Sequence, residues 1–145
     1  KLTMIEDNSV SEIYACHILE HVERSEVVSV LKEWNRVLKV GGVLRVAVPD
    51  FEAVAAEYQE KKDLQCFQGL LYGGQTYDYN YHHVAFDYKV LEYFLSEAGF
   101  SDVSRYDWRD FLPKDYDDYS RAYLPHLDFK HGRLMSLNVV TKKIK

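Results

Sequence analysis

The sequence lacks the marks of several large classes of protein. Its two cysteines, Cys16 and Cys66, lie far apart and show no metal-binding spacing, so we expect free thiols in a reducing cytosol. No apolar run has the length of a membrane span, and the N-terminus shows no secretory signal. The formal net charge of -5 argues against nonspecific nucleic-acid binding, which needs a basic face. We therefore expect a cytoplasmic protein that binds neither membranes nor nucleic acid.

A glycine-rich phosphate or nucleotide loop is also missing from the 145 residues. Such a loop follows a strand and opens a helix, and neither Gly41-Gly42 nor Gly73-Gly74 has that placement. The residues before Ile13 are too few to hold a further strand with such a loop. What remains is an ordinary globular composition, 47% hydrophobic and 28% charged, which predicts a single domain over residues 1–145.

The clearest positive feature is a strand–helix–strand unit over residues 13–51. Apolar residues recur at helical spacing after Ser25, the expected N-cap, and Gly41 or Gly42 is the expected helix stop. In open α/β sheets ligands bind outside the carboxyl ends of the strands, so the polar residues after both strands mark the expected site. The two predicted strands are Ser11–Cys16 and the apolar run Val43–Val48, which suits a strand covered by helices on both faces.

The rest of the chain predicts further helices, two strands and two loops. Asp87 is the expected N-cap of a helix that ends at Gly99. Residues 109–133 are polar and aromatic, and an irregular segment of that length is more often functional. The other predicted elements are helices over residues 51–62 and 64–72, a loop over residues 75–86, and strands over Val103–Trp108 and Ser136–Thr141.

The segment His17-Ile18-Leu19-Glu20-His21 matches HxxEH, the zinc pattern of inverzincin proteases. That chemistry needs both histidines on one helical face, whereas here the motif directly follows a predicted strand. The spacing reveals no third ligand, although His82 and His83 are available. We therefore predict no metal site and keep, as an alternative, a metalloprotein built on His17, His21 and one further ligand.

Two longer segments point to a known family. The run EIYACHILEHV (12–22), followed by LKEWNRVLKVGGVLRVAVPDF (31–51), resembles the second half of a class I S-adenosylmethionine-dependent methyltransferase, type 11-like. In that family the fourth strand ends in a similar loop, and the next helix ends in RVLKPGG. Residues 82–100, which end in EAGF, resemble a later segment of the same family. The resemblance implies a Rossmann-like α/β sheet with helices on both faces, an antiparallel last strand, and methyl transfer from S-adenosylmethionine.

The resemblance also implies roles for residues at the strand ends. Cys16, His17 and Ile18 are expected beside the methionine end of the cofactor. His17, with His82 and His83, is a candidate catalytic group, because histidine is the natural base near neutral pH for an acceptor that must lose a proton. The expected substrate-binding residues are Pro49, Asp50, Tyr81 and Trp108.

Other expectations follow from the parts of the family pattern that this chain lacks. Without the glycine-rich loop and the acidic residue after the second strand, we expect the isolated chain to bind S-adenosylmethionine weakly or not at all. The strand at Ile13–Cys16 has one unpaired edge, which favours a homodimer or a swapped arrangement through that edge. Given the acidic charge, a small molecule or a saccharide is the expected acceptor. A non-enzymatic binding or assembly module with the same half-fold is the alternative, favoured by the tyrosine-rich segment 114–123.

The sequence allows two interpretations of each of two segments. Residues 107–133 either cover the acceptor pocket or form a surface excursion that packs on itself. Glu20 and His21 either face ligand or tie their loop to neighbouring strands.

Overall fold

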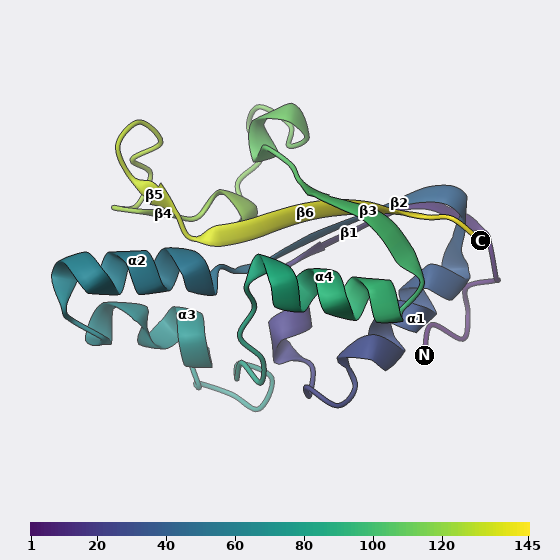
Figure 1. Cartoon of the computed structure of the whole chain (residues 1–145), viewed down its shortest axis with the longest axis horizontal. Helices are drawn as coiled ribbons and strands as arrows, with labels where there is room; N and C mark the ends of the chain where they lie inside the picture. The colour runs from purple at the N-terminus through teal and green to yellow at the C-terminus, as the bar shows by residue number, and fades with distance from the viewer.

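The centre of the structure is a four-stranded sheet built from Val10–Cys16 (β1), Leu38–Pro49 (β2), Phe100–Arg105 (β3) and Ser136–Lys143 (β6). The computed structural model describes all 145 residues. The strand order is β1-β2-β6-β3, in which β1 and β2 are parallel and β6 is antiparallel to both of its neighbours. A two-stranded ladder, Tyr123–Leu124 (β4) and Arg133–Leu134 (β5), stands apart from this sheet (Figure 1).

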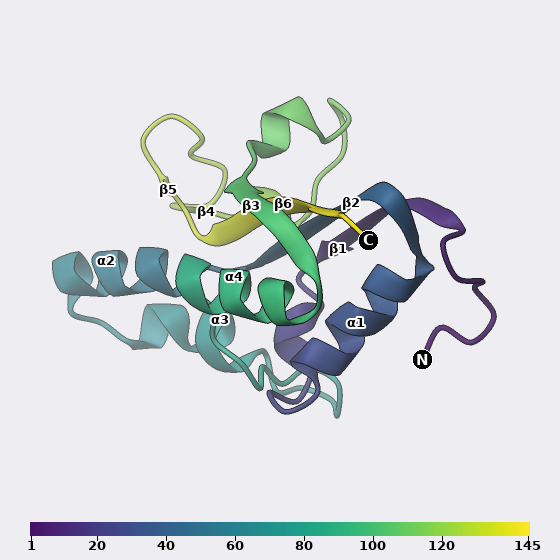
Figure 2. The ribbon, with the colours of Figure 1, turned by 45° about the vertical axis from the view of Figure 1, so that its right-hand side comes forward.

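Four α-helices lie on one side of the sheet (Figures 1 and 2). Alternate residues of the strands, such as Leu44, Val46 and Val139, face them and form the main core. None of the helices is long and apolar enough to cross a membrane. The helices are Val27–Val37 (α1), Phe51–Lys61 (α2), Gln68–Tyr72 (α3) and Tyr88–Glu97 (α4), with 3-10 turns at Leu19–His21 (η1) and Gln65–Phe67 (η2).

The opposite face of the sheet carries a different cover. Two 3-10 turns, Trp108–Asp110 (η3) and Tyr119–Arg121 (η4), lie across it together with the loops that flank them (Figure 1). On this face the Tyr14 ring packs edge-on against Phe111, and the Arg45 guanidinium lies 4.4 Å from the centre of the same ring. Helical structure is therefore present on both faces, as predicted, but α-helices cover only one of them.

The expected glycine stop of the first helix is wrong. The helix α1 ends at Val37, and Leu38 is already extended because it pairs with Val10 in the sheet. Gly41, with φ of 80°, lies inside β2, where the register with β1 jumps. The glycines thus form a bulge within the strand. Ser25 is also not the N-cap, since α1 starts after Glu26 and has no side-chain cap.

The later elements are mostly as predicted. Asp87 caps α4 by accepting a hydrogen bond from the backbone N–H of Val90, and Gly99 ends that helix with φ of 88°. The third strand, however, begins at Phe100 and not at Val103. Phe100 is buried and pairs directly with the end of β6, so the strand follows the helix after a turn of two residues.

Candidate functional site

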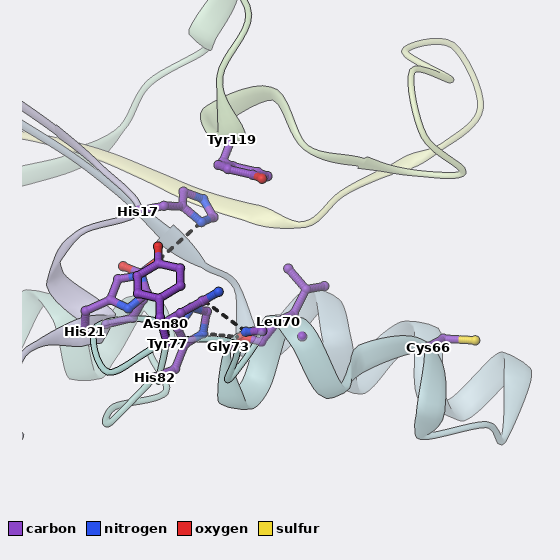
Figure 3. Close-up of a pocket in the computed structure, with 12 residues that line it drawn as sticks. His17, His21, Cys66, Leu70, Gly73, Tyr77, Asn80, His82 and Tyr119 are labelled. Atoms are coloured by element: carbon purple, nitrogen blue, oxygen red, sulfur yellow. Dashed lines mark hydrogen bonds and ion pairs between the residues drawn. The ribbon is translucent and has the colours of Figure 1, made fainter.

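A cavity of about 610 Å³ opens just past the carboxyl end of β1 (Figure 3). Its lining comes from three parts of the chain: the turn after β1, residues 66–82, and η4. In open α/β sheets, ligands bind outside the carboxyl ends of the parallel strands, which form this edge. The cavity is therefore the candidate functional site of this fold.

His17 is the first residue past β1, and its backbone leaves the strand in the left-handed region with φ of 51°. Its N–H still donates to the Ala47 carbonyl at 2.8 Å, which fixes the turn to β2. The nearly buried ring has Nε2 at 3.0 Å from the Ser136 hydroxyl and Nδ1 at 3.3 Å from Glu20 Oε1. Tyr119 covers the ring with centroids 5.4 Å apart (Figure 3). The ring is thus held in one orientation at the cavity wall.

Glu20 is fully buried in η1, and neither of its carboxylate oxygens has a hydrogen-bond partner. The approach of His17 brings an imidazole nitrogen close without the alignment of a hydrogen bond. A buried carboxylate without partners is costly, so such groups are uncommon in the interior of proteins. This side chain is the least satisfied polar group in the cavity wall.

His21 and His82 meet beside Glu20, with ring centroids 4.7 Å apart in an edge-on arrangement (Figure 3). The Nδ1 atom of His21 lies 3.0 Å from the Tyr81 carbonyl, and that of His82 lies 3.0 Å from the Leu70 carbonyl. Burial lowers the pKa of His82, which favours the neutral ring at pH 7.

The loop that carries His82 is held by its own backbone. The N–H of His83 donates to the Glu20 carbonyl at 2.7 Å, and the N–H of His82 donates to the Tyr72 carbonyl at 3.1 Å. At the start of the loop, Gly74 donates to the Asn80 side chain at 3.0 Å. These bonds explain how residues about 60 positions apart in the sequence come to share one wall.

Tyr119 lies in η4, on the far face of the sheet, and a series of hydrogen bonds holds this turn so that the ring lines the cavity. The Tyr14 hydroxyl donates to Asp118 at 2.6 Å, and the Ser120 N–H and hydroxyl donate to the same carboxylate. The Asn138 amide donates to the Ser120 carbonyl at 2.7 Å. The turn η4 is therefore anchored to β1 and β6, and it presents the tyrosine ring over His17.

The comparisons with known proteins agree on the fold. A family model described as a methyltransferase domain matches residues 1–46. A SAM-dependent methyltransferase from Archaeoglobus fulgidus aligns with a TM-score of 0.55 and 14% identity over 98% of this chain and 63% of its own. One from Methanosarcina mazei aligns with a TM-score of 0.55 and 17% identity over 97% of this chain and 62% of its own. One from Thermotoga maritima aligns with a TM-score of 0.52 and 19% identity over 96% of this chain and 58% of its own. No curated protein sequence matches the chain.

The chain has a class I S-adenosylmethionine-dependent methyltransferase-like fold. Its four strands reproduce the predicted arrangement, with β1 and β2 parallel and the last strand antiparallel. The chain spans 58% to 63% of the length of these three structures. At 14% to 19% identity, these alignments show the fold.

Within this methyltransferase fold, the predicted site residues fall into two groups. His17 and His82 line the cavity. The Cys16 side chain is half-buried beside Tyr14 and Asp118, and burial raises the pKa of its thiol to about 11. The side chain of Ile18 is half exposed. The ring of His83 lies outside the cavity, 3.3 Å from Glu23.

The predicted substrate-binding residues do not line the cavity. Pro49 is buried at the end of β2. Asp50 is also buried; it caps α2 through the Glu52 N–H and lies 3.5 Å from Arg105. Tyr81 is exposed and contributes only its carbonyl. Trp108 lies in the loops over the far face, where the guanidinium groups of Arg109 and Arg121 lie 4.6 Å and 4.8 Å from its ring. Their roles in binding stay predictions.

Several cavity residues were not among the sequence predictions. Tyr77 and Asn80 lie in a loop without a periodic pattern, and no local signal marks them. Tyr119 belongs to residues 107–133, one expectation for which was a cover of the acceptor pocket. Glu20 and His21 do have a signal, namely the HxxEH spacing. The structure shows that this spacing works through a tight turn after a strand, in place of a helix.

Proposed function

We propose that the protein transfers a methyl group from S-adenosylmethionine to a small-molecule or saccharide acceptor held in the cavity of His17. The observation that carries the proposal is the position of His17 at the carboxyl end of β1, where its nearly buried ring lines a cavity in a methyltransferase-like fold. The volume of about 610 Å³ suits a small ligand. The acidic net charge also favours such an acceptor over nucleic acid.

Methyl transfer needs a nucleophilic atom in line with the sulfonium methyl group. Positioning and exclusion of water supply most of the rate when the acceptor is already nucleophilic. For a hydroxyl or ammonium acceptor, a base must also take a proton. Three imidazoles line the cavity, those of His17, His21 and His82. Of these, His17 and His82 are the proposed proton acceptors. The half-buried Cys16 and the neighbouring Ile18 complete the proposed cofactor side of this edge.

The test is label transfer from S-adenosyl-L-[methyl-³H]methionine, at saturating cofactor, to a panel of small hydroxyl, amine and sugar acceptors. Replacement of a general base lowers turnover by about 100-fold or more, so we expect that loss for His17→Ala. The matched control is His131→Ala, because His131 is exposed and contacts only Asp128 in the remote hairpin. Equal label transfer by both variants, or transfer to none of the acceptors, contradicts the proposal.

We also propose that the 145-residue chain binds S-adenosylmethionine weakly by itself. The chain carries no glycine-rich loop that follows a strand and opens a helix, which is the usual cradle for a nucleotide. Isothermal titration of the purified chain measures this directly. A micromolar dissociation constant refutes the weak-binding proposal and leaves the assignment of methyl transfer intact.

A further inference from the structure

Glu20, His21 and His82 gather their side chains at one wall of the cavity. One ligand atom from each residue can be chosen so that all three lie within 4.8 Å of one another. We propose that these three residues form a mononuclear site for a divalent transition metal of the zinc class. The proposal rests on these side chains and not on the proposed methyl transfer. With an ion bound, His82 is a metal ligand, and His17 is then the proton acceptor that remains.

The two histidines are already in the tautomer that a metal needs. A carbonyl oxygen only accepts hydrogen bonds, so the bonds to the Tyr81 and Leu70 carbonyls place a proton on Nδ1 of His21 and of His82. Each Nε2 atom then carries a free lone pair. Metal-binding histidines nearly always have such a partner on the second ring nitrogen, because it fixes the orientation of the ring and its tautomer. Both supporting contacts are present before any ion arrives.

Glu20 supplies the second, independent observation. Its carboxylate is fully buried, and both oxygens lack a hydrogen-bond partner. Buried charges in proteins are either paired or coordinate a metal. An ion between this carboxylate and the two imidazoles satisfies the unpaired oxygens. His17, with Nδ1 at 3.3 Å from the carboxylate, then acts as a supporting contact.

The ligand set favours zinc or a similar transition metal over magnesium. Two imidazoles and one carboxylate suit zinc, cobalt or ferrous iron, whereas magnesium prefers oxygen ligands only. In tetrahedral zinc sites, bonds of about 2.0–2.1 Å put neighbouring ligand atoms about 3.4 Å apart. The ligand atoms lie within 4.8 Å of one another, so side-chain rotation must bring them closer by up to about 1.4 Å. A site with three protein ligands keeps one position open. All three proposed ligands line the cavity, so we expect that position to face it.

The experiment uses the whole chain, with Zn²⁺ alone in isothermal titration and Co²⁺ alone in visible spectroscopy. We expect one ion per chain and a tetrahedral Co²⁺ absorption that Zn²⁺ abolishes, with no effect of Mg²⁺. His82→Gln is expected to weaken Zn²⁺ binding by about 100-fold or more, the upper range for loss of a mere supporting residue. Its control is the adjacent His83→Gln, whose ring faces Glu23, and binding should stay unchanged.

A second measurement keeps the proposal falsifiable if His82→Gln fails to fold. The X-ray absorption spectrum of the Zn²⁺ complex of the unmodified chain should show nitrogen and oxygen ligands at about 2.0–2.1 Å with two imidazoles. Cys66 also borders the cavity but points away from the histidines (Figure 3), so a Cys66→Ser chain should bind equally well. A sulfur ligand in the spectrum, unchanged affinity in folded His82→Gln, or no binding of Zn²⁺ by the unmodified chain overturns the proposal.

Discussion

At the scale of single residues, the two free cysteines have contrasting surroundings. Cys16 is half-buried in β1, where burial first, and the nearby Asp118 carboxylate as well, raise the pKa of its thiol to about 11. Cys66 is exposed in η2 at the rim of the cavity. The thiolate is the reactive form of cysteine, so the two side chains should differ in rate toward alkylating reagents.

We expect iodoacetamide at pH 8 to modify one thiol of the native chain quickly and the other at least about tenfold more slowly, because a rise in pKa of one unit removes about nine-tenths of the thiolate. Peptide mapping over time assigns the fast site to Cys66. Cys66→Ser should remove the fast phase, and Cys16→Ser should remove only the slow one. Faster labelling of Cys16 than of Cys66 contradicts the structure of β1.

Glu57 joins α2 to β5 by an ion pair in which the carboxylate is buried and the cations are partly exposed. Its carboxylate accepts hydrogen bonds from Lys61 and from Arg133, each at 2.8 Å, and these cations hold the pKa of Glu57 below its usual range. The pKa in the folded state is then lower than in the unfolded state. The stabilisation is therefore complete above the ordinary glutamate pKa of about 4.3 and is lost as the pH falls through the folded value.

Glu57→Gln should lower the free energy of unfolding at pH 7 by about 1–2 kcal/mol, since it weakens two charge-assisted hydrogen bonds. The difference from the unmodified chain should shrink as the pH falls, because the native carboxylate becomes neutral as well. Urea unfolding at several pH values measures both effects. Glu60→Gln is the control, since Glu60 pairs with the same arginine but is exposed, and its effect should stay near 0.5 kcal/mol or less.

At the scale of elements, the sequence predicted where each unit lies better than where it ends. The strand–helix–strand unit was evident because the apolar residues of β1, α1 and β2 have clear periods. The end of α1 was not evident from the sequence, because the pairing of Leu38 with Val10 overrides the local signal of Gly41. The start of β3 was missed for a related reason, since Phe100 pairs with Lys143 at the far end of the chain.

The candidate site divides in the same way between local and distant contacts. His17 was predicted because it directly follows a strand at the edge where this fold binds ligands. The meeting of His21 with His82 was not, because it depends on a loop without a periodic pattern. The turn at Gly73 and the hydrogen bond from the His83 N–H to the Glu20 carbonyl place His82 beside His21. No spacing in the sequence reveals either feature.

Gly73 has a conformation that favours glycine and also no room for a side chain. Its φ is 77°, and an added Cβ would lie 2.4 Å from the Asn80 carbonyl oxygen. Gly69, in α3, has nothing within 4 Å of an added Cβ. The two glycines lie four residues apart, so they form a matched pair for testing the turn.

Gly73→Ala should lower the free energy of unfolding by more than about 1–2 kcal/mol, the cost of left-handed backbone for alanine, because the clash with Asn80 adds to it. Gly69→Ala should instead be neutral or stabilising by up to about 1 kcal/mol, since alanine favours a helix. Thermal and urea unfolding measure both. A Gly73→Ala chain as stable as the unmodified one would mean that the loop over residues 75–82 rearranges freely.

At the scale of the whole molecule, the two faces of the sheet are built differently. One face packs aliphatic side chains against α1 and α4. The other meets η4 through polar contacts, such as the bond from Tyr14 to Asp118 and that from Asn138 to Ser120. The same contacts place Tyr119 over His17. The turn η4 is therefore part of both the cover of the far face and the cavity wall. A substitution that shifts η4 should also move the Tyr119 ring relative to His17.

The position of β1 at the end of the strand order gives the last prediction. Its outer edge has no partner strand in the chain, and an open edge invites pairing with a second copy. We expect a concentration-dependent dimer in sedimentation velocity, with slower amide exchange in residues 10–16 as the dimer forms. Ser11→Lys should weaken the dimer by about tenfold or more, because charge at an edge strand opposes pairing, whereas Ser96→Lys on α4 should not. A monomer at all concentrations, with equal exchange in β1, shows that the edge stays unpaired.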